Sequence, residues 1–222
     1  MNCGSGSSDN KKDILKNLKI VSNKINTKSN KIVLLNQVHS NKFYYISKNS
    51  RLNNNEFEGD ALITNKRNLP IAVLTADCAP ILIYDEDKKM IAAIHAGWKG
   101  AYKGIVKKVI KFMIEKDCSP KNITVAIGPC ISVNNYEVKE DFKKKFLKKD
   151  KKNILFFKRN KNKNYFNLNK YILFQLKSLN IKKIDIINKD TFNKKNNFFS
   201  ARRSIIHNEN DYGRNISIIM IN

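Results

Sequence analysis

The sequence contains little histidine, proline, glycine or acid, and each shortage narrows the classes of protein that fit it. With 4 Pro and 8 Gly in 222 residues, there is no Pro/Gly/Ser-rich linker, and we find no internal repeat. The 4 cysteines show neither CxxC spacing nor the density of a disulfide-stapled scaffold. No apolar run approaches the about 18 residues of a membrane helix, and the polar start does not resemble a signal peptide. These absences predict one cytoplasmic domain, residues 1–222, with free thiols.

Acidic residues are also scarce, since 19 of them face 43 Lys and Arg and leave a net charge of +24. Such an excess suggests a nucleic acid or an acidic surface as partner. However, the excess is mostly lysine and accompanies abundant Asn and Ile, as in proteins from AT-rich genomes. The runs at 141–152 and 158–163 do not form an arginine stripe with interleaved aromatic residues. We therefore expect a solvated, lysine-rich surface and neither a nucleic-acid nor a membrane partner.

Hydrophobic periodicity predicts helices and strands that alternate irregularly. Helices are expected at residues 10–25, 101–116, 138–147 and 168–179. Strands are expected at residues 31–38, 43–46, 61–64, 70–75, 81–84, 90–94, 123–127, 184–187 and 216–221. Because a strict βαβ rhythm is absent, the pattern favours an α+β layered fold over a doubly wound sheet.

Three of the expected strands lead into a side chain that can bind a metal ion. They deliver His39, Cys78 and His95, and two imidazoles with one thiolate suit zinc or copper. Three protein ligands leave a fourth coordination position open, which is typical of a catalytic rather than a structural site. By spacing alone, the same residues also fit ordinary packing positions.

Seven motifs occur in an order that extends over nearly the whole chain. They are QVHS (37–40), EGDALIT (58–64), LTADCAP (74–80), HAGWKG (95–100), IGPCI (127–131), FFSARR (198–203) and YGR (212–214). In these motifs the chain resembles the YfiH family, also called the multicopper polyphenol oxidase (laccase) domain or peptidoglycan editing factor. The family's metal positions fall on His39, Cys78 and His95.

The resemblance implies a single-domain layered α/β sandwich with a mixed sheet, related to the cytotoxic necrotizing factor type of cysteine hydrolase. It also implies a zinc-dependent enzyme that phosphorolyses adenosine, inosine and methylthioadenosine to a free base and ribose 1-phosphate, and that deaminates adenosine. An oxidase activity with copper accompanies the older name. The expected partners are therefore a purine nucleoside and phosphate, the expected cofactor is Zn²⁺ with Cu²⁺ as the alternative, and the protein is expected to be a monomer or homodimer.

The chain departs from the family pattern in two places. Family chains begin about 20–30 residues earlier with a Gly-Gly-Val-Ser segment, so the domain is expected to lack that element. The usual Ser-Tyr-Arg-Arg occurs here as Ser-Ala-Arg-Arg at 200–203. Because an aromatic group is missing there, base stacking is expected to differ.

Two aspartates adjoin the expected ligands. Asp77 is our candidate for a catalytic acid or base, with orientation of His39 or His95 as the alternative role. Asp60 is expected to serve as a turn residue.

Four further side chains are candidates for substrate binding. Gln37 would share a strand face with His39, where it either binds substrate or pairs with backbone. Arg202, Arg203 and Arg214 carry guanidinium forks that match phosphate oxygens. Their alternative role is to neutralise carboxylates or to face solvent.

Three other functions compete with the phosphorylase. Cys78 with His95 suits a metal-free cysteine hydrolase or deamidase, or an enzyme that edits peptidoglycan precursors. Copper-dependent phenol oxidation fits less well, because 3 histidines are too few for a multicopper centre. The basic surface suits a protein that binds nucleic acid or cell-wall precursors.

Overall fold

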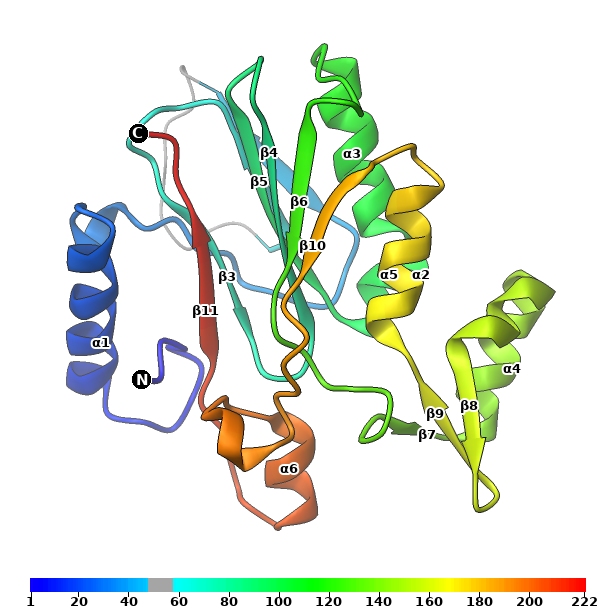
Figure 1. Ribbon diagram of the computed structural model, residues 1–222. Coiled ribbons are helices and arrows are strands. Elements are labelled where there is room, and N and C mark those ends of the chain that lie inside the picture. Colours follow the sequence, from blue (N-terminus) through cyan, green and yellow to red (C-terminus); the bar gives the residue numbers. More distant parts are fainter. Residues whose placement is uncertain (48–57) are drawn as a thin grey trace.

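The computed structural model describes residues 1–47 and 58–222, and a six-stranded mixed sheet lies at its centre (Figure 1). The strand order is β1-β2-β5-β4-β6-β10; the two outer pairs are parallel and the inner pairs antiparallel. The strands are β1 (Phe43–Ile46), β2 (Ala61–Thr64), β4 (Ala79–Asp85), β5 (Met90–Ala96), β6 (Ile123–Ile127) and β10 (Lys183–Ile186). The predicted α+β class with a mixed sheet is confirmed.

The central strand β5 shows why the sheet is buried on both faces. Side chains alternate across a strand, so Met90, Ala92 and Ile94 enter one apolar cluster while Ile91 and Ala93 enter the other. Helices cover the first face, and a two-stranded antiparallel sheet covers the second (Figure 1). These elements are α2 (Trp98–Lys103), α3 (Ile105–Glu115) and α5 (Leu168–Lys177), and β3 (Ile71–Thr75) with β11 (Asn215–Ile219).

The remaining elements lie outside the central sheet and the two layers that cover it. The small sheet β7-β9-β8 packs through an aromatic cluster in which the rings of Phe146 and Phe166 lie 4.8 Å apart. Its strands are β7 (Glu137–Val138), β8 (Phe157–Asn160) and β9 (Lys163–Phe166). The other helices are α1 (Lys11–Lys24), α4 (Glu140–Lys149) and α6 (Ala201–Ile206), with 3-10 turns at Ser29–Lys31, Lys151–Phe156 and Lys194–Asn196. None of the helices in the described part of the chain is long and apolar enough to span a membrane.

Two predicted helices differ from the structure. The helix predicted at 101–116 is divided, because Gly104 has φ 82° and ends α2 in the left-handed conformation before α3 begins. The helix predicted at 138–147 begins later, at Glu140, because the two residues before Lys139 pair with β9 as strand β7. The hairpin of β8 and β9 and the short α6 were not predicted.

The strand predicted at 31–38 is wrong. This segment is extended, but it forms only isolated bridges, through Val33 and Asn36. The side-chain amide of Gln37 takes the place of a backbone partner for Leu74: its Nε2 donates to the Leu74 carbonyl at 2.7 Å, and its Oε1 accepts from the Leu74 N–H at 2.8 Å. The segment therefore joins β3 through the backbone bridge at Val33 and through the side chain of Gln37, without a continuous ladder.

Candidate metal centre

Asp60 holds the two histidines of the site. It precedes β2 and is fully buried. Its Oδ1 accepts the backbone N–H of His39 at 3.0 Å and the Nδ1–H of His95 at 2.8 Å, while its Oδ2 accepts the N–H and the hydroxyl of Ser40. Burial alone would raise the pKa of this carboxyl, but the hydrogen bonds from His95 and Ser40 outweigh it and hold the pKa below its usual range.

The two histidines reach the site from different kinds of segment. His95 is buried inside β5, and its Nδ1–H donates to Asp60, which leaves Nε2 as the nitrogen that can bind a metal ion. Burial alone would lower the pKa of His95, but the Cys78 thiolate and the hydrogen bond to Asp60 outweigh it and raise the pKa to about 9, so a metal ion would displace the proton from Nε2. His39 is exposed and lies in the loop before β1, with φ 57°. The left-handed region is uncommon outside glycine, yet His, Asn and Asp enter it more readily than other residues. The ring centroids lie 4.7 Å apart and the ring planes are nearly perpendicular.

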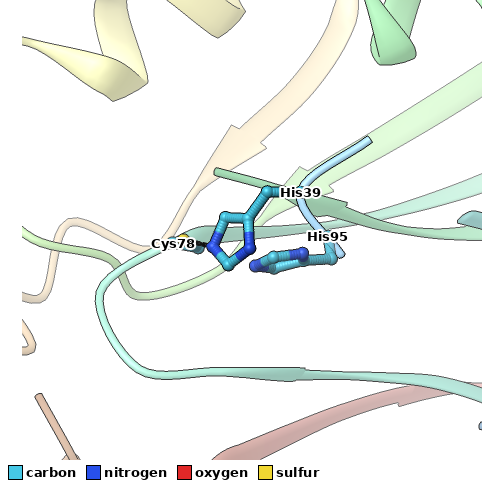
Figure 2. A group of neighbouring side chains, drawn as sticks. All are labelled: His39, Cys78 and His95. Carbon is cyan, nitrogen blue, oxygen red and sulfur yellow. Dashed lines mark hydrogen bonds between the residues drawn. The ribbon is translucent and has the colours of Figure 1, made fainter. Parts of the chain in front are cut away.

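Cys78 comes from the loop between β3 and β4, and its Sγ lies 3.6 Å from Nε2 of His39 (Figure 2). Burial alone would raise the pKa of this thiol. The charge of His95 and the hydrogen bonds from His39 and His95 outweigh that effect and lower the pKa to about 6. A thiolate is the form that binds metal ions and the form that attacks electrophiles.

The three side chains fit a metal ion in number, chemistry and spacing. One donor atom from each of His39, Cys78 and His95 lies within 4.8 Å of the others. Two imidazole nitrogens and one thiolate suit zinc, and three ligands leave a position for water or substrate. Gly97 makes room for the set, since a Cβ there would lie 2.7 Å from Cδ2 of His39 and 2.9 Å from Sγ of Cys78.

The three side chains open on a cavity of about 560 Å³. Its wall is formed by the extended segment 34–37, by parts of the β3–β4 region, by the N-terminal loop and by residues before β11. The lining residues are Gly4, Ser5, Gly6, Leu34, Leu35, Asn36, Gln37, His39, Leu74, Ala76, Cys78, His95, Tyr212 and Arg214. Small-molecule sites commonly have volumes of about 300–1,000 Å³.

The carboxylate of Asp77 accepts hydrogen bonds from three other residues of the chain. Asp77 has φ 83°. Its carboxylate accepts hydrogen bonds from the hydroxyls of Thr191 (2.6 Å) and Ser200 (2.9 Å) and from the N–H of Arg202 (2.6 Å). The carboxylate that orients His95 is instead Asp60, which occupies the predicted turn and also has the orienting role that the sequence suggested for Asp77. A catalytic role for Asp77 stays a prediction.

The structure separates the four predicted substrate-binding residues. Gln37 lines the cavity, although its amide pairs with backbone. Arg214 lines the same cavity. Arg203 donates to the carbonyls of residues 191, 192 and 198 and so secures that loop. Arg202 lies over the ring of Tyr136, in a different hollow of about 630 Å³.

The mixed α/β fold and the His₂Cys donor set at a cavity define the class: a protein with a candidate mononuclear metal centre. The particular family follows from comparison with known proteins. The chain belongs to the family described as multi-copper polyphenol oxidoreductase laccase, whose model matches residues 1–222. The YfiH resemblance predicted from the motifs is thereby confirmed.

Two relatives of this chain share one name, and a solved structure shares its fold. A protein of Rickettsia prowazekii named purine nucleoside phosphorylase is 36% identical over 202 residues, which are 88% of this chain and 79% of the relative. A protein of the same name from Haemophilus influenzae is 32% identical over 221 residues, or 98% and 85% of the two chains. The crystal structure of the Bacillus licheniformis hypothetical protein YfiH matches with a TM-score of 0.89 and 25% identity, and covers 100% of this chain and 85% of that one.

Proposed function

We propose that this protein is a zinc-dependent purine nucleoside phosphorylase that also deaminates adenosine. The observation that carries the proposal is 36% identity, over 88% of the chain, to a protein named purine nucleoside phosphorylase. The His39–Cys78–His95 cluster at a cavity of about 560 Å³ supports it. Adenosine, inosine and methylthioadenosine are the proposed nucleosides.

In phosphorolysis, the bond between the anomeric carbon and the purine nitrogen breaks, and its electron pair leaves with the base. The base takes up a proton, and a phosphate oxygen forms the new bond that gives ribose 1-phosphate. Deamination replaces the 6-amino group of adenosine by the oxygen of water and releases ammonia. Zinc held by the cluster would supply Lewis-acid polarisation of an oxygen.

The chain's own residues would position the reactants. Asp60 keeps the Nδ1 proton of His95 and so fixes the direction of its Nε2. Leu34, Leu35 and Leu74 give the cavity apolar wall on which a purine can pack. Asp77 remains our candidate for the catalytic acid or base.

The test is chromatography of adenosine, inosine and methylthioadenosine after incubation with zinc-loaded protein, with and without phosphate. We expect free base and ribose 1-phosphate only when phosphate is present, and inosine from adenosine in either case. Cys78→Ala should abolish both reactions. Cys118→Ala removes a buried thiol outside the cavity and serves as the matched control. Intact nucleosides in a preparation with confirmed zinc would refute the proposal.

One arrangement favours a second candidate, a metal-free cysteine hydrolase or deamidase. Cys78, His95 and Asp60 provide a thiol of lowered pKa, an adjacent imidazole and the carboxylate that orients it. Chelation separates the two functions, because a hydrolase of this kind keeps its activity without metal and loses it on alkylation. Copper loading followed by a phenol oxidation assay tests the activity in the family's description.

A further inference from the structure

Across the described ranges 1–47 and 58–222, Arg214 is the only permanently charged side chain that lines the cavity of the candidate metal centre. Among the described lining residues there is no aspartate or glutamate. The other groups that can ionise there are the three candidate ligands and Tyr212. Asp211, which does not line the cavity, pairs with one end of this guanidinium, so the wall offers an anion the remaining N–H donors of Arg214 and no facing carboxylate.

The guanidinium of Arg214 is held in place with part of its fork free. Its Nη1 donates to Oδ1 of Asp211 at 3.2 Å and to the Tyr212 carbonyl, and its Cζ lies 4.5 Å from the centroid of the Tyr212 ring. Its side chain packs against Gly4, where an added Cβ would lie 2.5 Å from Cδ of Arg214. Within residues 1–47 and 58–222, its Nε and Nη2 have no hydrogen-bond acceptor. Those nitrogens carry N–H groups in the geometry that matches two oxygens of one anion.

The N-terminal loop adds backbone donors to the same wall. Oδ1 of Asn2 accepts the N–H of Gly4 at 3.0 Å and the N–H of Arg214 at 2.8 Å, so the loop and the arginine form one unit. Ser5 and Gly6 line the cavity, and neither of their backbone N–H groups has an acceptor in the part of the chain that the structure describes. Successive backbone N–H groups in such loops commonly bind anions.

We propose that the Gly4–Gly6 loop and Arg214 form an oxyanion subsite that binds inorganic phosphate in the same cavity as the candidate metal centre. Phosphate as co-substrate rests on the proposed function, but binding of the oxyanion does not. Arg203, which donates to three carbonyls, and Arg202, which faces another hollow, are excluded from this role. The subsite deepens the proposed function, because it places the nucleophile of phosphorolysis beside the metal ligands.

The test is titration of the full chain with inorganic phosphate, followed by calorimetry, in zinc-loaded and in chelated protein. We expect Arg214→Gln to weaken phosphate binding by about 10-fold or more, the usual loss for a hydrogen bond to a charged group. Arg159→Gln is the control, because it removes the same charge from the exposed β8–β9 hairpin, outside the cavity. Unchanged binding in Arg214→Gln would overturn the subsite.

A second pair of variants guards against misfolding of Arg214→Gln. A Cβ at Gly6 meets nothing within 4 Å, so Gly6→Asp and Gly6→Asn both fit and differ in charge alone. We expect Gly6→Asp to abolish phosphate binding and Gly6→Asn to retain it. Equal binding by the two variants contradicts the subsite.

The same titration is repeated with two phosphate esters, ribose 1-phosphate and AMP. If they bind in a manner that depends on Arg214 while inorganic phosphate does not bind, the subsite accepts esters and the assignment to inorganic phosphate is wrong. Loss of phosphate binding in the variants supports the subsite even if the wild type fails to cleave nucleosides. Normal phosphate binding and KM in the variants of an active phosphorylase refutes the subsite and leaves the proposed function standing.

Discussion

Gly97→Ala is expected to disrupt the metal centre through a single methyl group. Gly97 has φ −69° and ψ 166°, which alanine adopts freely, so the backbone has no reason to move. The added Cβ would lie 2.7 Å from Cδ2 of His39 and 2.9 Å from Sγ of Cys78. The atoms nearest to the added methyl group therefore all belong to two of the candidate ligands.

The size of the effect follows from these distances. Carbon atoms in contact prefer a separation of about 3.5–4.0 Å, so His39 must retreat by about 1 Å. Metal sites tolerate departures of about 0.2 Å in their ligand distances. We expect zinc affinity to fall at least about 10-fold, or about 1.4 kcal/mol, and the metal-free protein to lose about 1–3 kcal/mol through overpacking.

Zinc affinity is measured by competition with a chromophoric chelator, and stability by urea unfolding of the metal-free protein. Gly6→Ala is the matched control, because a Cβ there meets nothing within 4 Å. It should bind zinc as the wild type does. If Gly97→Ala binds zinc with wild-type affinity, His39 and Cys78 do not hold the ion together and the site must be sought elsewhere.

Three further outcomes are expected. Asp60→Asn should reduce zinc affinity by about 10–100-fold in the same competition assay. The pKa of Asp60 is lowered by folding, so its carboxylate stabilises the folded protein fully above the unfolded pKa of about 3.9, and this stabilisation is lost as pH falls through the folded pKa. The difference in the free energy of unfolding between wild type and Asp60→Asn should therefore be smaller at pH 2 than at neutral pH, and an equal difference would contradict this. In metal-free protein, iodoacetamide should modify Cys78 first, because the other three thiols are buried and their pKa values are raised. Peptide mass mapping identifies the modified cysteine. Bound zinc should protect Cys78, and alkylation at an unchanged rate in the presence of zinc would argue against ligation by Cys78. Arg203→Gln should cost about 2–4 kcal/mol in urea unfolding, since the carbonyls of the buried Thr191 and the half-buried Phe192 and Phe198 lose a charged donor, and a loss below about 0.5 kcal/mol would show that the loop is held by other contacts.

The central sheet was predictable because the local hydrophobic pattern of the sequence indicates its strands. Apolar runs at 90–94 and 123–127 predict two of its strands, the run at 71–75 predicts a strand of the two-stranded sheet that covers it, and each strand forms where expected. The candidate ligands Cys78 and His95 lie in or shortly after such runs, so the local pattern also predicts their place at the strand ends.

Hydrogen bonds between residues that are far apart in the chain have no such pattern in the sequence and could not be predicted from it. Asp60 and His95 are 35 residues apart, and Gln37 and Leu74 are 37 apart, and no periodicity connects either pair. By sequence alone the three arginines are equivalent candidates for phosphate binding, and only the carbonyls around Arg203 and the cavity around Arg214 distinguish them. The hydrogen-bond partners of a side chain depend on the tertiary fold, and spacing along the chain does not determine them.

The two aspartates divide the work of holding the candidate ligands. Asp60 fixes His39 and His95 directly, whereas Asp77 fixes the backbone beside Cys78 by binding side chains and backbone of 191–202. The thiolate is therefore positioned by a loop more than 100 residues away in sequence, through hydrogen bonds that do not involve sulfur. Since Ser200 also caps α6 through the N–H of Arg203, the C-terminal part of the chain and the thiolate share one buried network. A change at Ser200 should thus alter the metal centre even though Ser200 touches none of its ligands.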